Sequence, residues 1–315
     1  MILVVGLSPA WQRTLVFEEF SQGKVNRAAH VNETASGKGV NVARVASILG
    51  ADVRLLTLAG GTRGTLLREN MERQPFGTRI VRVNAETRIC QTLLAGAGAT
   101  ELVEESGALS STEAKNVLRA FGAEARRAKL VVLTGTVPNG CGDDFYARLV
   151  HQSQLLGVPV LIDAQKAQLL NALRKQPLLV KINRDELSAA TRVNCDQPSG
   201  VSRALCRLLK NGPQHAVITD GPNSVYVSAK PGQAPTMLKP PRVKTENPIG
   251  SGDAMMAGIA VALMRAKPVL EAVRLGIACG AANAMTAEPG CVRLADVRKL
   301  VKRLCSTPGN RVRIV

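Results

Sequence analysis

Aromatic residues are scarce in this chain. They make up 3% of its 315 residues, with a single tryptophan. Because the bases of single-stranded nucleic acid bind largely by stacking on aromatic rings, this scarcity argues against that class of partner. Internal repeats and low-complexity tracts are also missing from the sequence. Together these absences favour an ordinary globular chain, long enough to bury a large core.

Paired cysteines and long apolar runs are missing as well. The seven cysteines are odd in number and widely spaced, and none forms a Cys-x-x-Cys pair. The sequence therefore predicts neither a zinc site nor a disulfide framework, and it favours a reducing cytoplasm. The apolar stretch at residues 1–7 has no basic leader and is too short for a signal peptide or a membrane span. We expect a cytoplasmic protein without a membrane segment.

Acidic residues are few relative to basic ones, 24 against 41, so the formal net charge is +17. Such a charge would suit a nucleic-acid binder. It equally suits an enzyme whose ligands are anions, because a positive field speeds their capture. Given the few aromatic residues, we favour the second interpretation. We interpret the basic stretch at residues 293–313 as a solvated helix face followed by a loose end.

Short apolar runs alternate with helical patterns along the chain. The predicted strands cover residues 2–5, 53–58, 130–134, 160–163, 179–182 and 216–219, and helical patterns follow at 38–49, 145–156 and 202–209. Continuously apolar strands between helices are typical of a mainly parallel sheet covered on both faces. The sequence predicts an α/β fold whose ligands lie beyond the carboxyl ends of the strands.

The most informative motif is Asn-Pro-Ile-Gly-Ser-Gly-Asp at residues 247–253, directly before an apolar helical stretch. Glycines let backbone amides approach a ligand, and the positive end of a helix favours an anion. A carboxylate here would repel that anion unless it takes the proton of an attacking hydroxyl, as aspartates do in phosphoryl transfer. We predict a kinase with Asp253 as the base and Gly250, Ser251 and Gly252 as the anion hole. A helix cap is the alternative interpretation.

The position of Asp253 also predicts its acidity. In the first turn of a helix, the dipole should stabilise the carboxylate and lower its pKa. Asp253 would then be a weak base in the ground state, which a loose transition state tolerates because the proton leaves late.

A second glycine motif, Ser-Gly-Lys-Gly-Val-Asn at residues 36–41, begins another predicted helix. Lys38 places a positive charge at the helix start, and Asn41 can hydrogen-bond a ligand that carries hydroxyls. Two anion sites imply two anionic ligands. The pattern Gly-x-x-x-x-Gly-Lys-Ser/Thr is absent, which excludes a Walker-type ATPase.

These motifs resemble those of the PfkB/ribokinase carbohydrate kinases, most closely the 1-phosphofructokinase and tagatose-6-phosphate kinase branch. Matching segments follow the family's order at residues 23–27, 37–41, 86–88, 135–138, 183–186 and 250–253. The resemblance implies a ribokinase-like three-layer sandwich around a mainly parallel sheet, with a small β-sheet lid. It implies an α/β nucleotide-binding and catalytic domain at residues 1–11, 32–86 and 104–315, and a lid at residues 12–31 and 87–103 that is often shared between two subunits of a homodimer.

The resemblance also implies an activity, the transfer of a phosphoryl group from ATP to a hydroxyl of fructose 1-phosphate, tagatose 6-phosphate or fructose 6-phosphate. The cations Lys38, Arg27 and Arg88 would hold the existing phosphate of the sugar. The implied sugar-binding residues are Gln12, Arg27, Gly37, Lys38, Gly39, Asn41 and Arg88. The implied ATP-binding residues are Lys181, Asn183, Thr219, Gly221, Gly252, Ala278 and Asn283, and Glu186 would bind Mg²⁺ through water.

Each of these implied roles has a simpler alternative. A single Arg or Lys can be a solvated surface charge. Asn183 followed three residues later by Glu186 can be a helix cap. The small residues around Ala278 and Asn283 can form a packed core helix instead of a pocket for the base.

The chain departs from the family pattern in two places. Gln12 stands where the family usually has an aspartate that binds a sugar hydroxyl. Thr-Asp-Gly-Pro-Asn at residues 219–223 replaces the commoner Ser-Leu-Gly-Ala-Asp/Glu-Gly, which puts a carboxylate and a proline beside the expected ATP site. A neutral amide in place of a carboxylate changes the sugar preference, weakens binding or marks a member without turnover. Two alternatives therefore stay open: a kinase of an unphosphorylated sugar or nucleoside, and a non-catalytic sensor of sugar phosphates.

Overall fold

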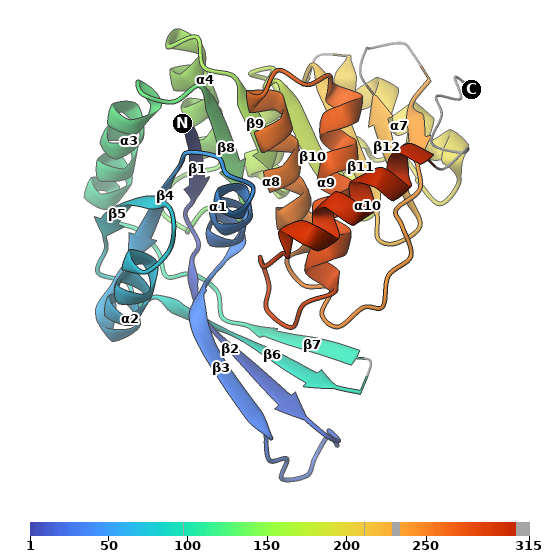
Figure 1. Cartoon of the computed structure of the whole chain (residues 1–315). Helices are drawn as coiled ribbons and strands as arrows, with labels where there is room; N and C mark the ends of the chain where they lie inside the picture. The colour runs from blue at the N-terminus through green and yellow to red at the C-terminus, as the bar shows by residue number, and fades with distance from the viewer. Residues whose placement is uncertain (97, 211, 229–233, 307–315) are drawn as a thin grey trace.

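The computed structural model describes residues 1–96, 98–210, 212–228 and 234–306, and these residues form two separate β-sheets (Figure 1). Residue 97 of the predicted lid and the end of the predicted basic stretch, residues 307–315, lie outside the described residues. The large sheet has the spatial order β13 (Thr236–Leu238), β12 (Ser224–Ser228), β11 (His215–Asp220), β10 (Leu179–Asn183), β9 (Val160–Asp163), β8 (Leu130–Thr134), β1 (Ile2–Gly6), β4 (Val53–Ala59) and β5 (Gly77–Arg82).

The large sheet is mainly parallel, as the apolar runs predict. In this spatial order, all neighbours from β11 through to β5 pair in parallel. Strands β12 and β13 are added antiparallel at the other edge, beside β11. The interior strand β1, between β8 and β4, is completely buried, and its alternate residues enter different cores: Val4 belongs to one cluster and Leu3 to the other. A strand whose two faces are both apolar must be covered on both sides.

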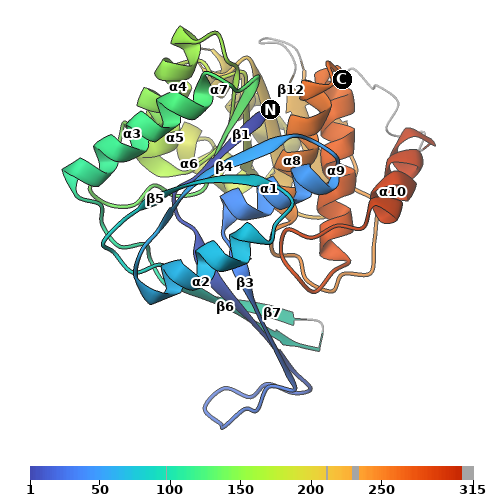
Figure 2. The same ribbon diagram turned by 60° about the vertical axis from the view of Figure 1, so that its left-hand side comes forward.

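Helices cover both faces of this sheet and complete three layers (Figures 1 and 2). The helices packed on the Val4 face include α1 (Lys38–Ile48), α8 (Ser251–Met264), α9 (Val269–Ala284) and α10 (Leu294–Ser306), with α2 (Gly61–Glu72) alongside. The helices packed on the Leu3 face include α3 (Ser111–Ala125), α4 (Phe145–Leu155), α5 (Lys166–Leu173), α6 (Arg184–Thr191) and α7 (Pro198–Leu209). The predicted three-layer α/β fold is confirmed.

The small sheet extends from the carboxyl edge of the large one, because β1 passes into it after only residues 7–9 (Figure 2). Its spatial order is β3 (His30–Ser36), β2 (Ala10–Phe17), β6 (Arg88–Ala95) and β7 (Gly98–Val103). Strand β3 reaches Ser36, so the sheet includes residues 32–36, which the predicted boundaries assign to the α/β domain. Every residue of the edge strand β7 is exposed.

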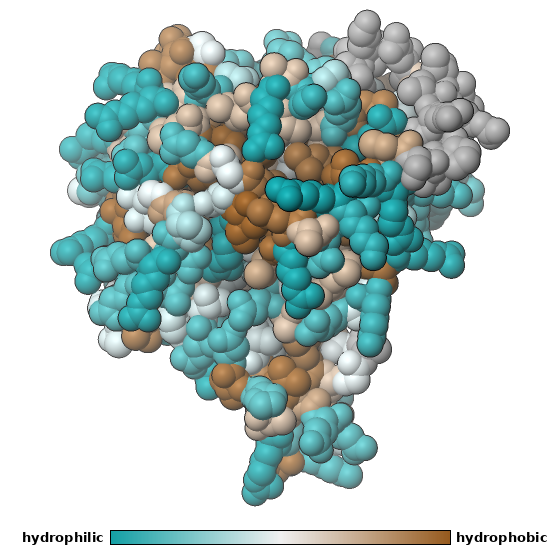
Figure 3. Space-filling view, in the orientation of Figure 1, coloured by the Kyte–Doolittle hydropathy of each residue, from teal (hydrophilic) through white to brown (hydrophobic). Residues whose placement is uncertain are grey.

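The outer surface is largely hydrophilic on the face shown in Figure 3. Among the residues that the structure describes, no helix is long and apolar enough to cross a membrane. All seven cysteines are free thiols.

Candidate active site

The glycine turn at residues 247–253 is held in place by two buried asparagines. The side chain of Asn247 accepts from the Ile249 amide at 3.0 Å and donates to the Ala287 carbonyl at 2.8 Å. Asn283 donates to the Ile249 carbonyl at 2.8 Å and accepts from the Gly290 amide at 2.7 Å. Both side chains are fully buried. These hydrogen bonds of Asn247 and Asn283 therefore hold the turn in place without a ligand.

Glycine is required at the centre of this turn. Gly250 has φ 81°, and a β-carbon there would lie 2.8 Å from the Gly290 nitrogen. Helix α8 begins without a side-chain cap, and its first backbone bond runs from the Ala254 amide to the Gly250 carbonyl at 2.9 Å. The amides of Gly252 and Asp253 precede that first donor, so they are available to an anion.

Asp253 lies at this helix start, and its carboxylate faces the second glycine motif. Asn41 Nδ2 donates to Asp253 Oδ2 at 2.9 Å, and Ser36 Oγ donates to Asn41 Oδ1 at 3.2 Å. Asp253 is only 6% exposed. The two motifs, 212 residues apart in the sequence, therefore form one site.

The expected lowering of the Asp253 pKa is wrong. Burial raises the pKa of Asp253 to about 6, and the negative charge of Asp163 adds to this rise, while Lys38, the Asn41 hydrogen bond and Lys181 act against it. Loss of hydration outweighs the helix dipole because the dipole acts on a group with almost no contact with water. With a pKa of about 6, Asp253 is a better proton acceptor near neutral pH than the sequence suggests.

Asp163, which the sequence analysis did not single out, lies at the centre of the charged groups. It ends strand β9 and is 1% exposed. Its Oδ2 is 2.5 Å from Lys181 Nζ, and its Oδ1 is 3.0 Å from Lys38 Nζ. Burial alone would raise the pKa of Asp163, but the ammonium groups of Lys181 and Lys38 lower it to about 2. An acidic residue at the carboxyl end of an apolar parallel strand was the available signal.

Lys38 and Lys181 lie at the anion hole. The charge of Asp163 raises the pKa of Lys38 above its usual 10.5, so this side chain stays protonated. Lys181 is 5% exposed, and its Nζ lies 3.4 Å from where a β-carbon on Gly252 would be. Lys181 therefore lies beside Gly252, and Lys38 lies on the other oxygen of the Asp163 carboxylate.

The glycines around Lys38 allow close packing at the base of the small sheet. Gly37 has φ 107°, and a β-carbon there would lie 3.0 Å from Pro9 Cα. A β-carbon on Gly39 would lie 2.6 Å from Gly6 Cα. Helix α1 thus starts in direct contact with both the end of β1 and the start of β2.

Gln12 faces the interior from strand β2. It is 2% exposed, and its Nε2 donates to Thr92 Oγ1 at 2.9 Å on the neighbouring strand β6. The neutral amide therefore has a neutral partner where the family usually has a carboxylate.

The three cations predicted to share one phosphate have different partners in this chain. Arg88 donates to the carbonyls of Glu104 and Ser8 at 3.0 and 3.1 Å. Arg27 is exposed on the loop at residues 18–29, which Figures 1 and 2 show at the outer end of the small sheet. Lys38 forms an ion pair with Asp163 at 3.0 Å.

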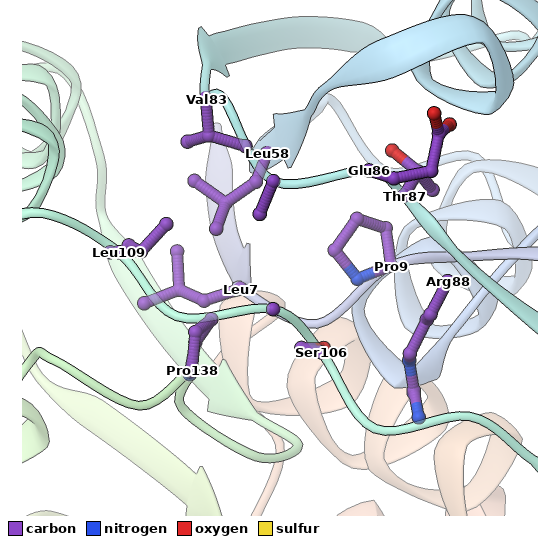
Figure 4. A pocket seen from close by; sticks show the side chains of 12 residues that line it. Leu7, Pro9, Leu58, Val83, Glu86, Thr87, Arg88, Ser106, Leu109 and Pro138 are labelled. Atoms are coloured by element: carbon purple, nitrogen blue, oxygen red, sulfur yellow. The ribbon is translucent and has the colours of Figure 1, made fainter.

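A small cavity of about 30 Å³ lies beside Arg88, where the two sheets meet (Figure 4). Leu7, Leu58 and Leu109 form an apolar side, while Glu86 and Arg88 lie toward the other. Glu86 caps helix α2, accepting from the Thr62 and Arg63 amides at 3.2 and 2.7 Å. The Glu86 carboxylate therefore already accepts hydrogen bonds from the amides at the start of α2.

The predicted nucleotide residues divide into edge and interior positions. Thr219 lies near the carboxyl end of β11. Gly221, two residues later, has φ 51°, and no atom beyond the adjacent residues lies within 4 Å of where its β-carbon would be. Ala278 and Asn283 are 0% exposed, which fits the packed-helix alternative for α9. Asp220, one of the departures, pairs with Arg184 at 3.2 Å.

Asn183 and Glu186 form a capping box at the start of α6. Asn183 Oδ1 accepts from the Glu186 amide at 2.7 Å, and Glu186 Oε2 accepts from the Asn183 amide at 2.8 Å. Glu186 Oε1 also accepts from Gln165 Nε2 at 2.6 Å. Each carboxylate oxygen can accept a further hydrogen bond, so Glu186 can still bind a metal-bound water. That fits Mg²⁺, which keeps several waters.

Direct metal ligation has no support in the part of the chain that is described, because no three His, Cys, Asp or Glu side chains gather closely enough to hold an ion.

The fold and the site together define a class of protein, a lidded α/β kinase with a ribokinase-like fold. The features that define it are the mainly parallel sheet, the small second sheet, and the glycine turn with its buried Asp253 and two lysines.

Comparison with known proteins identifies the family. Residues 1–291 match the pfkB family carbohydrate kinase, so the chain belongs to the pfkB family and is a sugar kinase. Phosphofructokinase-2 from Escherichia coli, in complex with substrates and products, is similar with a TM-score of 0.88 at 23% identity, covering 96% of this chain and 99% of that one. A possible 1-phosphofructokinase from Thermotoga maritima gives 0.86 at 21% identity, covering 96% and 97%. Arabidopsis thaliana ribokinase, complexed with ribose and ATP, gives 0.75 at 20%, covering 96% and 98%.

Proposed function

We propose that this sugar kinase phosphorylates a ketohexose phosphate, namely fructose 1-phosphate, tagatose 6-phosphate or fructose 6-phosphate, to the bisphosphate. Sugar kinases of this family use ATP, and the product would be ADP. The observation that carries the proposal is the hydrogen bond between Asn41 and Asp253, because it joins the amide-rich helix start to the motif next to the small sheet. A sugar hydroxyl between the two sheets would then meet the transferring phosphoryl group.

Asp253 accepts the proton of the attacking hydroxyl in this mechanism. Its pKa of about 6 keeps most of the carboxylate ionised at neutral pH, so the base is ready before the substrate binds. The amides of Gly252 and Asp253 at the open start of α8, with Ser251 and Gly250 shaping the turn, stabilise negative charge on the transferring group. Lys38 and Lys181 add positive charge at the same place.

Mg²⁺ would be held through water by Glu186, with Asn183 fixing the carboxylate. When bound, it would neutralise negative charge on the polyphosphate of ATP. Thr219, Gly221 and Asn183 lie at the carboxyl edge of β10 and β11, where ligands of parallel sheets bind. Ala278 and Asn283 would support this region from the interior.

The existing phosphate of the sugar would lie near Arg88, the cation at the junction of the two sheets. Arg27, on the outer loop of the small sheet, suits a lid that pairs with a second subunit, and we propose a homodimer through this sheet. The exposed edge strand β7 and the exposed apolar side chains of Val31, Leu102 and Val103 support such a pairing. Escherichia coli phosphofructokinase-2 has been described in a tetrameric inhibited form.

A kinase of an unphosphorylated sugar is the second candidate. The observation in its favour is that Lys38 binds Asp163 and Arg27 lies on the outer loop, which leaves Arg88 as the phosphate-binding cation within one subunit.

An assay that couples ADP release to a colour change, run with each of the three sugar phosphates and with fructose, tests both. We expect turnover with at least one phosphosugar and none with fructose. Turnover with fructose alone would favour the second candidate, and ligand binding without ADP release would indicate a sensor.

A further inference from the structure

We propose that Asp163 is a positioning residue that holds the ammonium groups of Lys38 and Lys181 at the start of helix α8, where the transferring phosphoryl group binds. This inference rests on the proposed function, because it assigns a role in the same phosphoryl-transfer step. Asp163 itself does not touch the reacting atoms in this proposal; it acts through the two lysines.

The geometry brings three separate elements together. Lys38 comes from α1, Asp163 from the end of β9 and Lys181 from β10, and each oxygen of the Asp163 carboxylate takes one lysine, at 3.0 and 2.5 Å. Asp163 and Lys181 are almost completely buried, while the Lys38 side chain is 39% exposed. Lys181 Nζ is also 3.4 Å from the β-carbon position of Gly252. The Asp163 carboxylate is thus hidden from solvent and faces two cations next to the anion hole.

Two ammonium groups this close to each other need a counter-charge. Without one they would repel, and a buried lysine would tend to lose its proton. Lysine also has a long flexible stem, so holding its end in one position costs conformational entropy unless a partner fixes it. Asp163 meets both needs for Lys38 and Lys181 at once. The phosphoryl group would then meet two cations that are already charged and already in position.

The alternative is that Asp163 forms an ion pair only for stability, and this explanation has less support here. Buried ion pairs often add little to stability, because the loss of hydration offsets the attraction. Asp163 stands at the carboxyl edge of a parallel strand, the side of the sheet where ligands bind. The two lysines that Asp163 holds, Lys38 from α1 and Lys181 from β10, also act on the carboxylate of Asp253.

The test is Asp163→Asn, which keeps the shape of the side chain and removes its charge. We expect kcat to fall by about tenfold to a hundredfold with a smaller change in the KM of the sugar. The acidic limb of the pH profile of kcat/KM should also move to lower pH. The negative charge of Asp163 opposes ionisation of Asp253, so its removal lets Asp253 lose its proton more easily. The shift of this limb reports the lost charge of Asp163, whereas the fall in kcat with a smaller change in KM reports the lost positioning of the two lysines.

Asp143→Asn, at an exposed aspartate in the loop before α4, is the matched control and should keep both the rate and the limb. The inference is overturned if Asp163→Asn keeps the wild-type kcat while the wild type turns over. If the wild type consumes no ATP with any sugar, the proposed function fails instead.

A measurement on the unaltered protein decides the geometry in either case, including a case in which Asp163→Asn does not fold. Wild-type protein is treated briefly with acetic anhydride at mildly alkaline pH, and the acetylated lysines are identified by mass spectrometry. Lys181 and the partly exposed Lys38 should react at least tenfold more slowly than the exposed Lys24, because an ammonium held by a carboxylate is not a nucleophile. Equal reaction of Lys38 and Lys24 would overturn the inference.

Discussion

Asn41 donates a hydrogen bond of 2.9 Å to one oxygen of Asp253, and this contact joins helix α1 to helix α8. The bond fixes the plane of the carboxylate through Oδ2. Among the described residues, Oδ1 of Asp253 accepts no hydrogen bond. One oxygen is thus used for orientation, and the other remains for the proton of a substrate hydroxyl.

Replacing Asp253 by asparagine should reduce turnover by about two to four orders of magnitude, because general bases contribute factors of this size. Nucleotide binding should change little, since the amides of the turn and both lysines stay in place. ADP release and calorimetric titration with ATP measure the two effects separately. Asp143→Asn serves as the control for an exposed aspartate, and near-normal turnover of Asp253→Asn would remove Asp253 from the role of base.

The same substitution should stabilise the protein at neutral pH. The pKa of Asp253 is raised from 3.8 to about 6, so between these values the folded state binds more protons than the unfolded state and stability falls as the pH rises. The difference corresponds to roughly 3 kcal/mol. Urea unfolding should show Asp253→Asn more stable than wild type at pH 7.5 and equal to it near pH 4.

Asp163 acts in the opposite direction and does not disturb this comparison. Its pKa is lowered to about 2, so its contribution is present above pH 4 and is lost only as the pH falls toward 2. An equal difference between wild type and Asp253→Asn at both pH values would show that Asp253 does not titrate in this range.

Gly290→Ala should impair activity although Gly290 is not expected to touch a ligand. It has φ 68°, and a β-carbon there would lie 2.6 Å from the Asn41 β-carbon, so the asparagine that orients Asp253 must move. We expect turnover to fall at least tenfold, in addition to a loss of stability. Gly157→Ala is the matched control: its φ is 67° and nothing lies within 4 Å of the added carbon. It should cost about 1–2 kcal/mol of stability and leave turnover unchanged. Equal activity of the two variants would contradict the prediction.

Gln12→Asp restores the residue type that the family usually has and should change the choice of sugar. A carboxylate at this buried position accepts from Thr92 and from sugar hydroxyls, whereas the amide also donates. We expect the ratio of kcat/KM values among the sugars to change about tenfold or more, with little change in the KM of ATP. Gln91→Asp, on the opposite face of strand β6, is the control. Unchanged ratios would show that residue 12 does not select the sugar.

Leu102→Glu should weaken assembly if the small sheet pairs two subunits. Leu102 is 52% exposed on the edge strand β7, and a buried charge there would oppose the contact. Light scattering after size-exclusion chromatography measures the mass. Leu155→Glu, at a residue 74% exposed near the end of α4, should leave the mass unchanged. A dimer that survives Leu102→Glu would place the interface elsewhere.

The sequence predicted the sheet because its strands carry the signal locally. The runs at residues 130–134 and 160–163 coincide with β8 and β9, since buried parallel strands are apolar throughout. The short antiparallel strands β12 and β13 were not predicted. The predicted helix at residues 202–209 also begins earlier, at Pro198, a residue that suits the first helical position.

The sequence was less informative about the site, because charges act through space. The motifs around Lys38 and Asp253 were recognisable from glycine spacing, and the structure brings them together. The ion pairs of Asp163 join residues 125 and 18 positions away, so no local pattern shows them. The raised pKa of Asp253 likewise depends on burial by distant elements.

Gly37 alone separates the last residue of β3, Ser36, from the first residue of α1, Lys38. A movement of β3 relative to α1 must therefore be absorbed by the torsion angles of this one residue or passed on to the ammonium group that Asp163 holds. If the movement is passed on to the ammonium group of Lys38, a sugar that shifts the sheet would alter the affinity for nucleotide. Linkage then requires nucleotide to alter the affinity for sugar by the same factor.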